Sequence, residues 1–384
     1  MSDPNEIKIN TVAFNHDGSL FALGTTQGFS IFSCSPFKIL CSENIEGGVS
    51  LVQVLGKSNI ICYVKTITNK KETISEIVLW DQSKLAVIVD IKLPDKVLAI
   101  KINFLHLFVI SKNKIEVFLI SKMARIEEIK TQDNSRGIFS VAQTEKGSIM
   151  VYPYSKKSKV GVVNFYINEQ QNDNNKNNED KEFNFWAHTS AIGCLAINRE
   201  GTLITTCSEN GTLLRVFNLK GEIGYEFRRG SDKAVIMNLS FDYNSNFVAC
   251  TSDKGTIHVF VLSQTGTVDF DLNNPEQTKN RHEFHEIDTH ESFFGNLMNK
   301  ISAAKRLAEV HRSYAQFRLE SKNSYCSFYG EGNDLFLHVI SPEGIFYKAE
   351  FDPKAGGEII DYMPYDLTSK VEEFNQVKQV KKGI

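Results

Sequence analysis

The chain has 384 residues, and its 43 Lys and Arg against 46 Asp and Glu give a formal net charge of −3. This balance argues against a general nucleic-acid-binding protein, because such proteins carry an excess of basic side chains that neutralises phosphates. With 41% hydrophobic and 23% charged residues, the chain can bury enough apolar surface to fold over most of its length.

The cysteines and the apolar stretches point to a protein without metal, cofactor or membrane span. The chain has seven Cys, with no C-x-x-C pair, and no secretory leader precedes Asn10. We therefore expect reduced thiols in a cytosolic protein. The most apolar stretch, 97–110, contains Lys101 and His106 and is shorter than the roughly 20 residues that a spanning helix needs.

From Val12 onward, one unit of strand, polar turn, strand, Gly-containing turn and strand recurs with apolar residues at a period of two. The units begin near Val12, Val49, Val97, Ile138, Cys194, Asn238 and Ser324. Gly18, Gly201, Gly211 and Gly255 lie where a hairpin needs positive φ. We predict an all-β chain that forms a seven-bladed β-propeller of the WD-repeat type over residues 1–367. Whether an early strand near 7–10 closes the ring stays open.

Three polar or irregular stretches do not fit the repeat: 168–182, 263–311 and 368–384. Removing them leaves about 43 residues per unit, within the usual length of a blade. The first stretch is rich in Asn and is predicted to be a disordered loop between the fourth and fifth units. The last is predicted to be a polar C-terminal tail with a solvated, frayed end.

Donor side chains gather on the fifth and sixth units and on YEFRRGSDK, residues 225–233, between them. Successive side chains of an extended segment point to opposite sides, so Arg228 and Arg229 are expected to serve two neighbouring pockets. The fifth unit adds His188, Thr206, Ser208, Gly211, Thr212 and Arg215, and the sixth adds Ser252, Thr256 and His258. Such donor-rich sets bind phosphate monoesters, although each His, Ser or Thr taken singly also fits a hydrogen bond within its own blade.

FRRG at 227–230, inside a chain of seven units, resembles the PROPPIN family of polyphosphoinositide-binding β-propellers, which includes the WIPI proteins and has F/L-R-R-G as its hallmark. The resemblance spans nearly the whole chain, through VAFNHDGSLFALGT from Val12, AHTSAIGCLAIN from Ala187, GTIHVF from Gly255 and SYAQFRL from Ser313. It implies two head-group sites. The first would be lined by His188, Thr206, Ser208, Gly211, Thr212, Arg215 and Arg228. The second would be lined by Arg229, Gly230, Ser252, Thr256 and His258.

The resemblance also implies a function. Members bind phosphatidylinositol 3-phosphate and phosphatidylinositol 3,5-bisphosphate, so we expect a cytoplasmic protein, monomeric in solution, peripherally associated with autophagosome-precursor and endosomal or lysosomal membranes. A lipid-transfer or conjugation-machinery protein of autophagy is the implied partner. Endolysosomal membrane remodelling, or a scaffold whose main ligand is another protein, stays open as an alternative. We expect no enzyme, because no acid, base and nucleophile set converges in the sequence.

The insertion 263–311 lies within the sixth unit and is expected beside the second site. In its centre the apolar period changes from two to that of a helix. Such a helix gains stability in a membrane interface, so we predict a membrane-inserting loop. The inserting side chains would be Phe293, Phe294, Leu297, Met298 and Ile301. A helix packed on the propeller or on a protein partner is the alternative.

His188 and His258 suggest a pH dependence. A His that becomes charged beside a phosphate has a raised pKa in the bound state. On this hypothesis, affinity falls as the pH rises from about 6 to 8.

Overall fold

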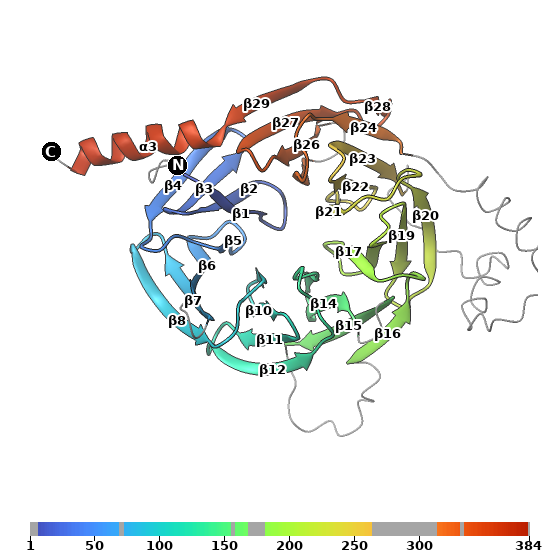
Figure 1. The fold of residues 1–384 in the computed structure, drawn as a ribbon, viewed down its shortest axis with the longest axis horizontal. Helices are drawn as coiled ribbons and strands as arrows, with labels where there is room; N and C mark the ends of the chain where they lie inside the picture. Colours follow the sequence, from blue (N-terminus) through green and yellow to red (C-terminus); the bar gives the residue numbers. More distant parts are fainter. Residues whose placement is uncertain are drawn as a thin grey trace, which may run out of the picture.

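The computed structural model describes residues 7–68, 73–154, 158–167, 181–262, 313–330 and 334–382. Their strands form seven sheets arranged around a central axis (Figure 1). Six sheets have four strands, and the sheet of blade 6 has a fifth. The prediction of an all-β, seven-bladed propeller is confirmed.

The first four blades follow one another along the chain, each running from an inner to an outer strand. Blade 1 contains β1 (Ile9–Phe14), β2 (Leu20–Thr25), β3 (Gly28–Cys34) and β4 (Phe37–Asn44). Blade 2 contains β5 (Leu51–Val54), β6 (Ile60–Thr68), β7 (Thr73–Asp81) and β8 (Ala86–Leu93). Blade 3 contains β9 (Ala99–Ile102), β10 (His106–Ser111), β11 (Lys114–Leu119) and β12 (Ala124–Lys130). Blade 4 contains β13 (Ser140–Thr144), β14 (Gly147–Pro153), β15 (Lys159–Tyr166) and β16 (Glu182–Trp186).

The last three blades complete the ring. Blade 5 contains β17 (Ile192–Ile197), β18 (Leu203–Ser208), β19 (Leu213–Asn218) and β20 (Ile223–Arg228). Blade 6 contains β21 (Ile236–Phe241), β22 (Phe247–Ser252), β23 (Thr256–Val261), β24 (Ala315–Arg318) and the short β28 (Gly357–Glu358). Blade 7 contains β25 (Tyr325–Tyr329), β26 (Leu335–Ile340), β27 (Ile345–Phe351) and β29 (Tyr362–Asp366), and helix α3 (Leu367–Lys382) follows.

The hydrophobic core lies between blades, because successive side chains of each strand face opposite neighbours. On blade 5, Leu214 and Phe227 pack with Ile236 and Phe260 of blade 6. The opposite face of blade 5 packs against blade 4, for instance through Phe217. Middle strands such as β10 and β22 are therefore buried along their whole length, on both faces of the sheet.

The ring closes by side-chain packing and not by exchange of a strand. The early strand β1 pairs with β2 of its own blade, and all four strands of blade 7 come from the end of the chain. Phe21 of blade 1 stacks on Phe346 of blade 7, with ring centroids 5.2 Å apart. The Gly18 carbonyl lies 3.1 Å from Nδ1 of His338. These contacts join the two ends of the propeller.

The C-terminal stretch is a helix up to residue 382, so the prediction of a solvated, frayed end is wrong there. Asp366 caps the helix, since its carboxylate accepts hydrogen bonds from Ser369 N at 3.1 Å and Ser369 Oγ at 2.9 Å. Val371 is buried in the seam between blades 7 and 1, and Lys378 pairs with Glu43 at 2.8 Å. Burial of a few apolar side chains overrides the polar composition of the segment.

Two other predictions concern segments that the structure describes only at their edges. The Asn-rich loop prediction, 168–182, extends too far, because Glu182 already begins β16; residues 168–180 lie outside the described chain. The insertion 263–311, with its predicted inserting side chains, also lies outside it. In the part of the chain that is described, no helix combines the length and apolar character required to cross a membrane.

Candidate functional site

The first predicted group meets on the face of blade 5 that is turned toward blade 4. Thr206 pairs with Arg215, and Arg215 pairs with Glu226, so these side chains share one face of β18, β19 and β20. Leu213 at the start of β19 pairs with Arg228 at the end of β20. Arg228 therefore lies at the same end of the blade as the turn 209–212.

His188 and Thr206 bind each other. His188 Nε2 lies 2.9 Å from Thr206 Oγ1, and both residues are buried. Burial, together with the positive charge of Arg215, lowers the pKa of His188 to about 3. This neutral pair attaches the segment before β17 to β18, which is the hydrogen bond within the blade that the sequence also allowed.

Arg215 is held by its own blade. Its Nε donates to Glu226 Oε2 at 2.6 Å, and one terminal nitrogen donates to the Ala187 carbonyl at 2.8 Å. The Glu226 carboxylate offsets much of the charge of Arg215, so this guanidinium orients the site and contributes less net charge to it.

Gly211 has a structural role that differs from the predicted one. Its N–H donates to the Ser208 carbonyl at 2.9 Å, so it is not free for a ligand. Its φ is +65°, and a Cβ here would lie 2.0 Å from the Ala234 carbonyl oxygen. Glycine is required for the conformation of this turn.

Three donors remain uncommitted. Among the described residues, the side chains of Ser208, Thr212 and Arg228 make no hydrogen bond or ion pair. Thr212 and Arg228 are half-buried, and Ser208 is buried at the end of β18. A guanidinium and two hydroxyls at the same end of one blade form a donor set that suits an anion.

Arg229 points away from this set. Its Nε donates to the Gly211 carbonyl at 2.6 Å, and a terminal nitrogen donates to the Asp232 carbonyl. Arg229 also lowers the pKa of His258 on blade 6, so its charge acts on the blade 6 side of this segment. Arg229 thus shapes the loop that enters blade 6.

The second group lies on the face of blade 6 that is turned toward blade 5. His258 is 9% exposed, and its Nδ1 has no partner among the described residues. Burial, followed by Arg229 and Arg318, lowers its pKa to about 4. Ser252 is buried and accepts from Lys254 N at 3.3 Å, whereas Thr256 is half-buried.

Arg318 is not among the residues that the sequence predicts for the second site. It pairs with Thr256 across β23 and β24, as Arg228 pairs with Leu213 in blade 5. Its side chain is 67% exposed and lies 3.4 Å from Glu358. Because the insertion separates β24 from the rest of blade 6, only the repeat position of Arg318 could have revealed it from the sequence.

For Gly230 and the insertion, the structure gives only the backbone of the glycine and the two described ends of the insertion. A Cβ on Gly230 would meet no atom within 4 Å, and its φ is not left-handed, so its backbone does not require glycine. The ends of the insertion, at Leu262 and Ser313, adjoin the end of β23 and the start of β24, opposite Thr256 and Arg318. Five to six residues, roughly 16–20 Å of extended chain, separate these ends from Thr256 and Arg318.

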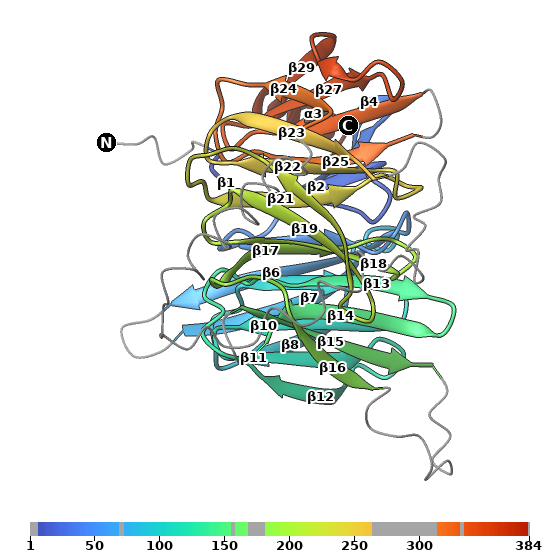
Figure 2. The same cartoon turned by 90° about the vertical axis from the view of Figure 1, so that its right-hand side faces the viewer.

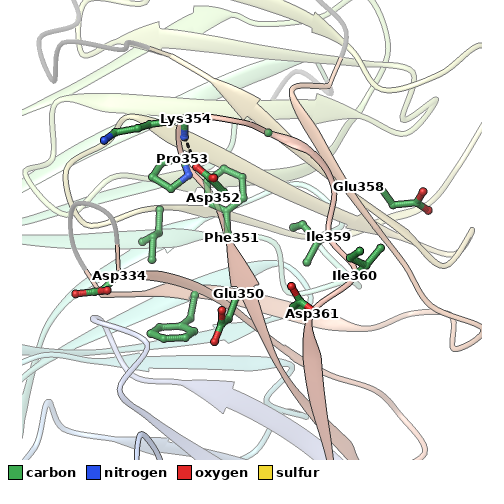
Figure 3. A pocket seen from close by; sticks show the side chains of 13 residues that line it. Asp334, Glu350, Phe351, Asp352, Pro353, Lys354, Glu358, Ile359, Ile360 and Asp361 are labelled. Carbon is green, nitrogen blue, oxygen red and sulfur yellow. Dashed lines mark hydrogen bonds between the residues drawn. The ribbon is translucent and has the colours of Figure 1, made fainter.

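A cavity of about 560 Å³ lies elsewhere, on blade 7 and at β28 (Figure 3). Its wall contains the carboxylates of Asp334, Glu350, Asp352, Glu358 and Asp361 and a single cation, Lys354. This negative lining does not suit the anion that the donor set between blades 4 and 6 favours.

Comparison with known proteins agrees with this architecture. The PROPPIN family model matches residues 8–367. The chain belongs to the PROPPIN family. Among curated PROPPIN relatives, autophagy-related protein 18e of Arabidopsis thaliana is 28% identical over 93% of this chain and 87% of the relative. Autophagy-related protein 18 of Dictyostelium discoideum is 27% identical over 90% of each chain.

Solved structures show the same fold. Hsv2 of Kluyveromyces lactis has a TM-score of 0.68 and 22% identity, covering 94% of this PROPPIN and all of the Hsv2 chain. A solved complex of KlAtg21 with the coiled coil of AgAtg16 has a TM-score of 0.66 and 21% identity, covering 94% of this chain and 100% of that one. At these identities the likeness concerns the fold alone.

Proposed function

We propose that this PROPPIN is a phosphoinositide effector that binds phosphatidylinositol 3-phosphate and phosphatidylinositol 3,5-bisphosphate around FRRG and recruits autophagy machinery to membranes. The observation that carries the proposal is the uncommitted donor set of Ser208, Thr212 and Arg228. A half-buried guanidinium without a carboxylate partner retains a full positive charge where solvent screening is reduced. A phosphate monoester satisfies all three donors at once.

The residues of the first site divide into two roles. Ser208, Thr212 and Arg228 contact the phosphate directly. His188, Thr206, Gly211 and Arg215 hold the strands and the turn that carry these donors, as their internal hydrogen bonds indicate. In the second site, Thr256 supplies a hydroxyl and Arg318 supplies an exposed guanidinium that also pairs with Glu358. They lie beside Ser252, His258, Gly230 and the loop that Arg229 fixes.

Two modest sites on one protein act together on a membrane. Once the first head group is bound, the second binding event is intramolecular, so weak single-site affinity becomes tight association. We include the predicted inserting residues of 263–311 in this proposal: Phe293, Phe294, Leu297, Met298 and Ile301. The protein is then cytoplasmic and peripherally bound to autophagosome-precursor and endosomal or lysosomal membranes.

The pathway rests on the relatives. Those named above are called autophagy-related, and the Atg21 complex contains a coiled coil of Atg16. We therefore propose a partner from the conjugation or lipid-transfer machinery of autophagy. Endolysosomal remodelling, or a scaffold whose main ligand is a protein, is the alternative. In either case the propeller binds and does not catalyse.

Vesicle co-sedimentation tests the proposal. Vesicles contain phosphatidylinositol, its 3-phosphate, its 4-phosphate or its 3,5-bisphosphate. We expect the wild type to bind only the 3-phosphorylated vesicles and Arg228→Thr to bind about 10- to 100-fold more weakly, since a hydrogen-bonded charge contributes about 1.5–3 kcal/mol. The Arg228 side chain has no hydrogen-bond or ion-pair partner among the residues that the structure describes, so its replacement should leave the fold unchanged by circular dichroism.

Two further variants sharpen this test. Arg228→Thr combined with Arg229→Thr should abolish binding. Arg199→Thr removes an equal charge from a different position, where the guanidinium lies 4.1 Å from the ring centroid of Tyr243, and should bind like the wild type. Equal binding to every anionic vesicle, or no effect of the FRRG substitutions, would contradict the proposal. Either result would favour the alternative, a scaffold whose main ligand is a protein.

A further inference from the structure

Three neighbouring blades end their outer strands in the same way. In blade 4, Lys159 at the start of β15 pairs with Trp186 at the end of β16. In blades 5 and 6, the same first-to-last pairing joins Leu213 with Arg228 and Thr256 with Arg318. Trp186, Arg228 and Arg318 therefore occupy equivalent positions on consecutive blades. Their strands β16, β20 and β24 follow one another along the rim at the right of Figure 1, the side that Figure 2 turns toward the viewer.

Trp186 stands out in this row because it is a large, exposed indole. Its exposed fraction is 43%, and Nζ of Lys159 lies 4.8 Å from the ring centroid. The same Nζ donates to Asn184 Oδ1 at 2.9 Å, which fixes the ammonium beside the ring. The rim of blade 4 thus presents an aromatic surface with a cation at its edge.

The backbone that carries the indole leads directly into the first proposed head-group site. Ala187, the next residue, accepts the hydrogen bond from Arg215, and His188 follows with its bond to Thr206. Any surface that delivers a phosphate to Arg228 therefore approaches the end of β16 as well. The next outer strand along the rim ends at Arg318 and adds a third cation to the row.

The chemistry of this row fits the interface of an anionic membrane. Trp is enriched at membrane interfaces, because its ring is apolar while its N–H remains hydrogen-bonded at head-group depth. Lys places its ammonium among the phosphates while its methylenes cover apolar surface. Lys159, Arg228 and Arg318 complement the negative charge of such a surface.

We propose that Trp186 enters the head-group layer of an anionic membrane and anchors blade 4 beside the first head-group site. The inference rests on the proposed function and adds a membrane contact that neither head-group site contains. It also adds an orientation: the outer-strand ends of blades 4 to 6 face the membrane together. The described residues that flank the insertion, Leu262 and Ser313, lie at the opposite end of β23 and β24.

The chain itself supplies a spectroscopic test, because it has only two Trp. Trp80 lies on β7 of blade 2, and its indole donates to Gln82 Oε1 at 2.9 Å. The variant Trp80→Phe leaves Trp186 as the single emitter. On vesicles with phosphatidylinositol 3-phosphate and brominated phosphatidylcholine, we expect its emission to shift to shorter wavelength and to be quenched. Arg228→Thr in the same background should abolish both changes.

Affinity measurements separate membrane anchoring from folding and from head-group recognition. We expect Trp186→Ala to weaken vesicle binding about tenfold, as for loss of a partly buried aromatic side chain. Its affinity for soluble inositol 1,3-bisphosphate should equal that of the wild type, and Trp186→Tyr should restore most of the vesicle affinity. Phe104→Ala is the matched control, because Phe104 is 59% exposed on the β9–β10 turn, at the opposite end of the strands.

The outcomes distinguish this inference from the function on which it rests. If the wild type does not bind 3-phosphorylated vesicles, the proposed function fails. If the wild type binds and Arg228→Thr does not, but Trp186 emission is unchanged and Trp186→Ala binds normally, only the membrane anchor fails. Normal vesicle binding by Trp186→Ala together with loss of a protein partner would assign the indole to a protein interface and overturn the proposal.

Discussion

The two site histidines show how burial decides the chemistry of single residues. Both look like phosphate donors in the sequence, yet His188 lies against Thr206, and His258 lies between blades 5 and 6. Burial and neighbouring Arg lower their pKa values to about 3 and about 4. The sequence-based hypothesis of a charged His beside the phosphate is therefore not supported by this geometry.

The pH dependence of binding follows with a definite sign. A His whose pKa lies near 3 or 4 is neutral throughout pH 6–8, so neither His gains or loses charge there. The phosphate completes its second ionisation near pH 6, which strengthens its attraction to Arg. We expect vesicle affinity to stay constant or rise slightly from pH 6 to 8, measured by co-sedimentation at fixed ionic strength. A clear fall in vesicle affinity from pH 6 to 8 would instead support the hypothesis of a charged His beside the phosphate.

Two glycines of the site allow a matched comparison of stability. Gly211 has a left-handed φ, and a Cβ there would overlap the Ala234 carbonyl oxygen, so Gly211→Ala should lower the free energy of unfolding by roughly 1–3 kcal/mol. Gly230 has neither constraint, and Gly230→Ala should change it by less than about 0.5 kcal/mol. Urea denaturation measures both values. If both variants lost the same free energy of unfolding, the backbone of the turn at Gly211 would have to rearrange to accept a Cβ without strain.

At the scale of elements, the relative position of blades 5 and 6 depends on a distant arginine. Arg136 precedes β13, and its guanidinium donates to the carbonyls of Gly193 at 2.7 Å and Ile236 at 2.8 Å. These carbonyls belong to β17 and β21, the innermost strands of blades 5 and 6, on which we propose the head-group sites. One side chain therefore connects the segment before blade 4 with blades 5 and 6.

Removing this connection should destabilise the propeller. Arg136→Met leaves two carbonyls without their charged donor, and we expect a loss of about 1–3 kcal/mol in the free energy of unfolding, measured by urea denaturation. Arg136→Lys keeps the charge but loses the two-pronged geometry, so its cost should be intermediate. An unchanged unfolding midpoint in Arg136→Met would show that the two hydrogen bonds add nothing to stability.

At the scale of the whole molecule, closure of the ring is the decisive event. Blades 7 and 1 meet through stacked Phe side chains, and Phe346 is fully buried, with ring centroids 5.2 Å from both Phe21 and Phe37. No strand crosses this seam between the two sheets. Packing therefore has to hold together the two ends of a chain that are far apart in sequence.

Opening this seam should be costly. We expect Phe346→Ala to lower the free energy of unfolding by about 3–5 kcal/mol, the usual range for a buried Phe. Phe346→Leu keeps most of the volume and should cost less than about 1.5 kcal/mol. Equilibrium denaturation followed by tyrosine and tryptophan emission compares the two. A loss below about 1 kcal/mol for Phe346→Ala would mean that the stacked rings do not hold the ring closed.

The number of blades could be predicted from the amino-acid sequence alone. Alternating apolar residues and Gly-containing turns are local signals, so seven units could be recognised without knowing their contacts. The Arg228–Arg229 step was also readable, since strand geometry alone sends neighbouring side chains to opposite faces.

Only the tertiary structure decided what each donor is free to do. Thr206 and Ser208 look alike in the sequence, but Thr206 bonds to His188, and the Ser208 hydroxyl stays uncommitted. Arg318 and Trp186 align with Arg228 only through cross-strand pairing, and helix α3 forms because Val371 finds the seam between blades 7 and 1. Periodicity is a property of neighbours along the chain, whereas hydrogen-bond commitment and burial depend on residues brought together by folding.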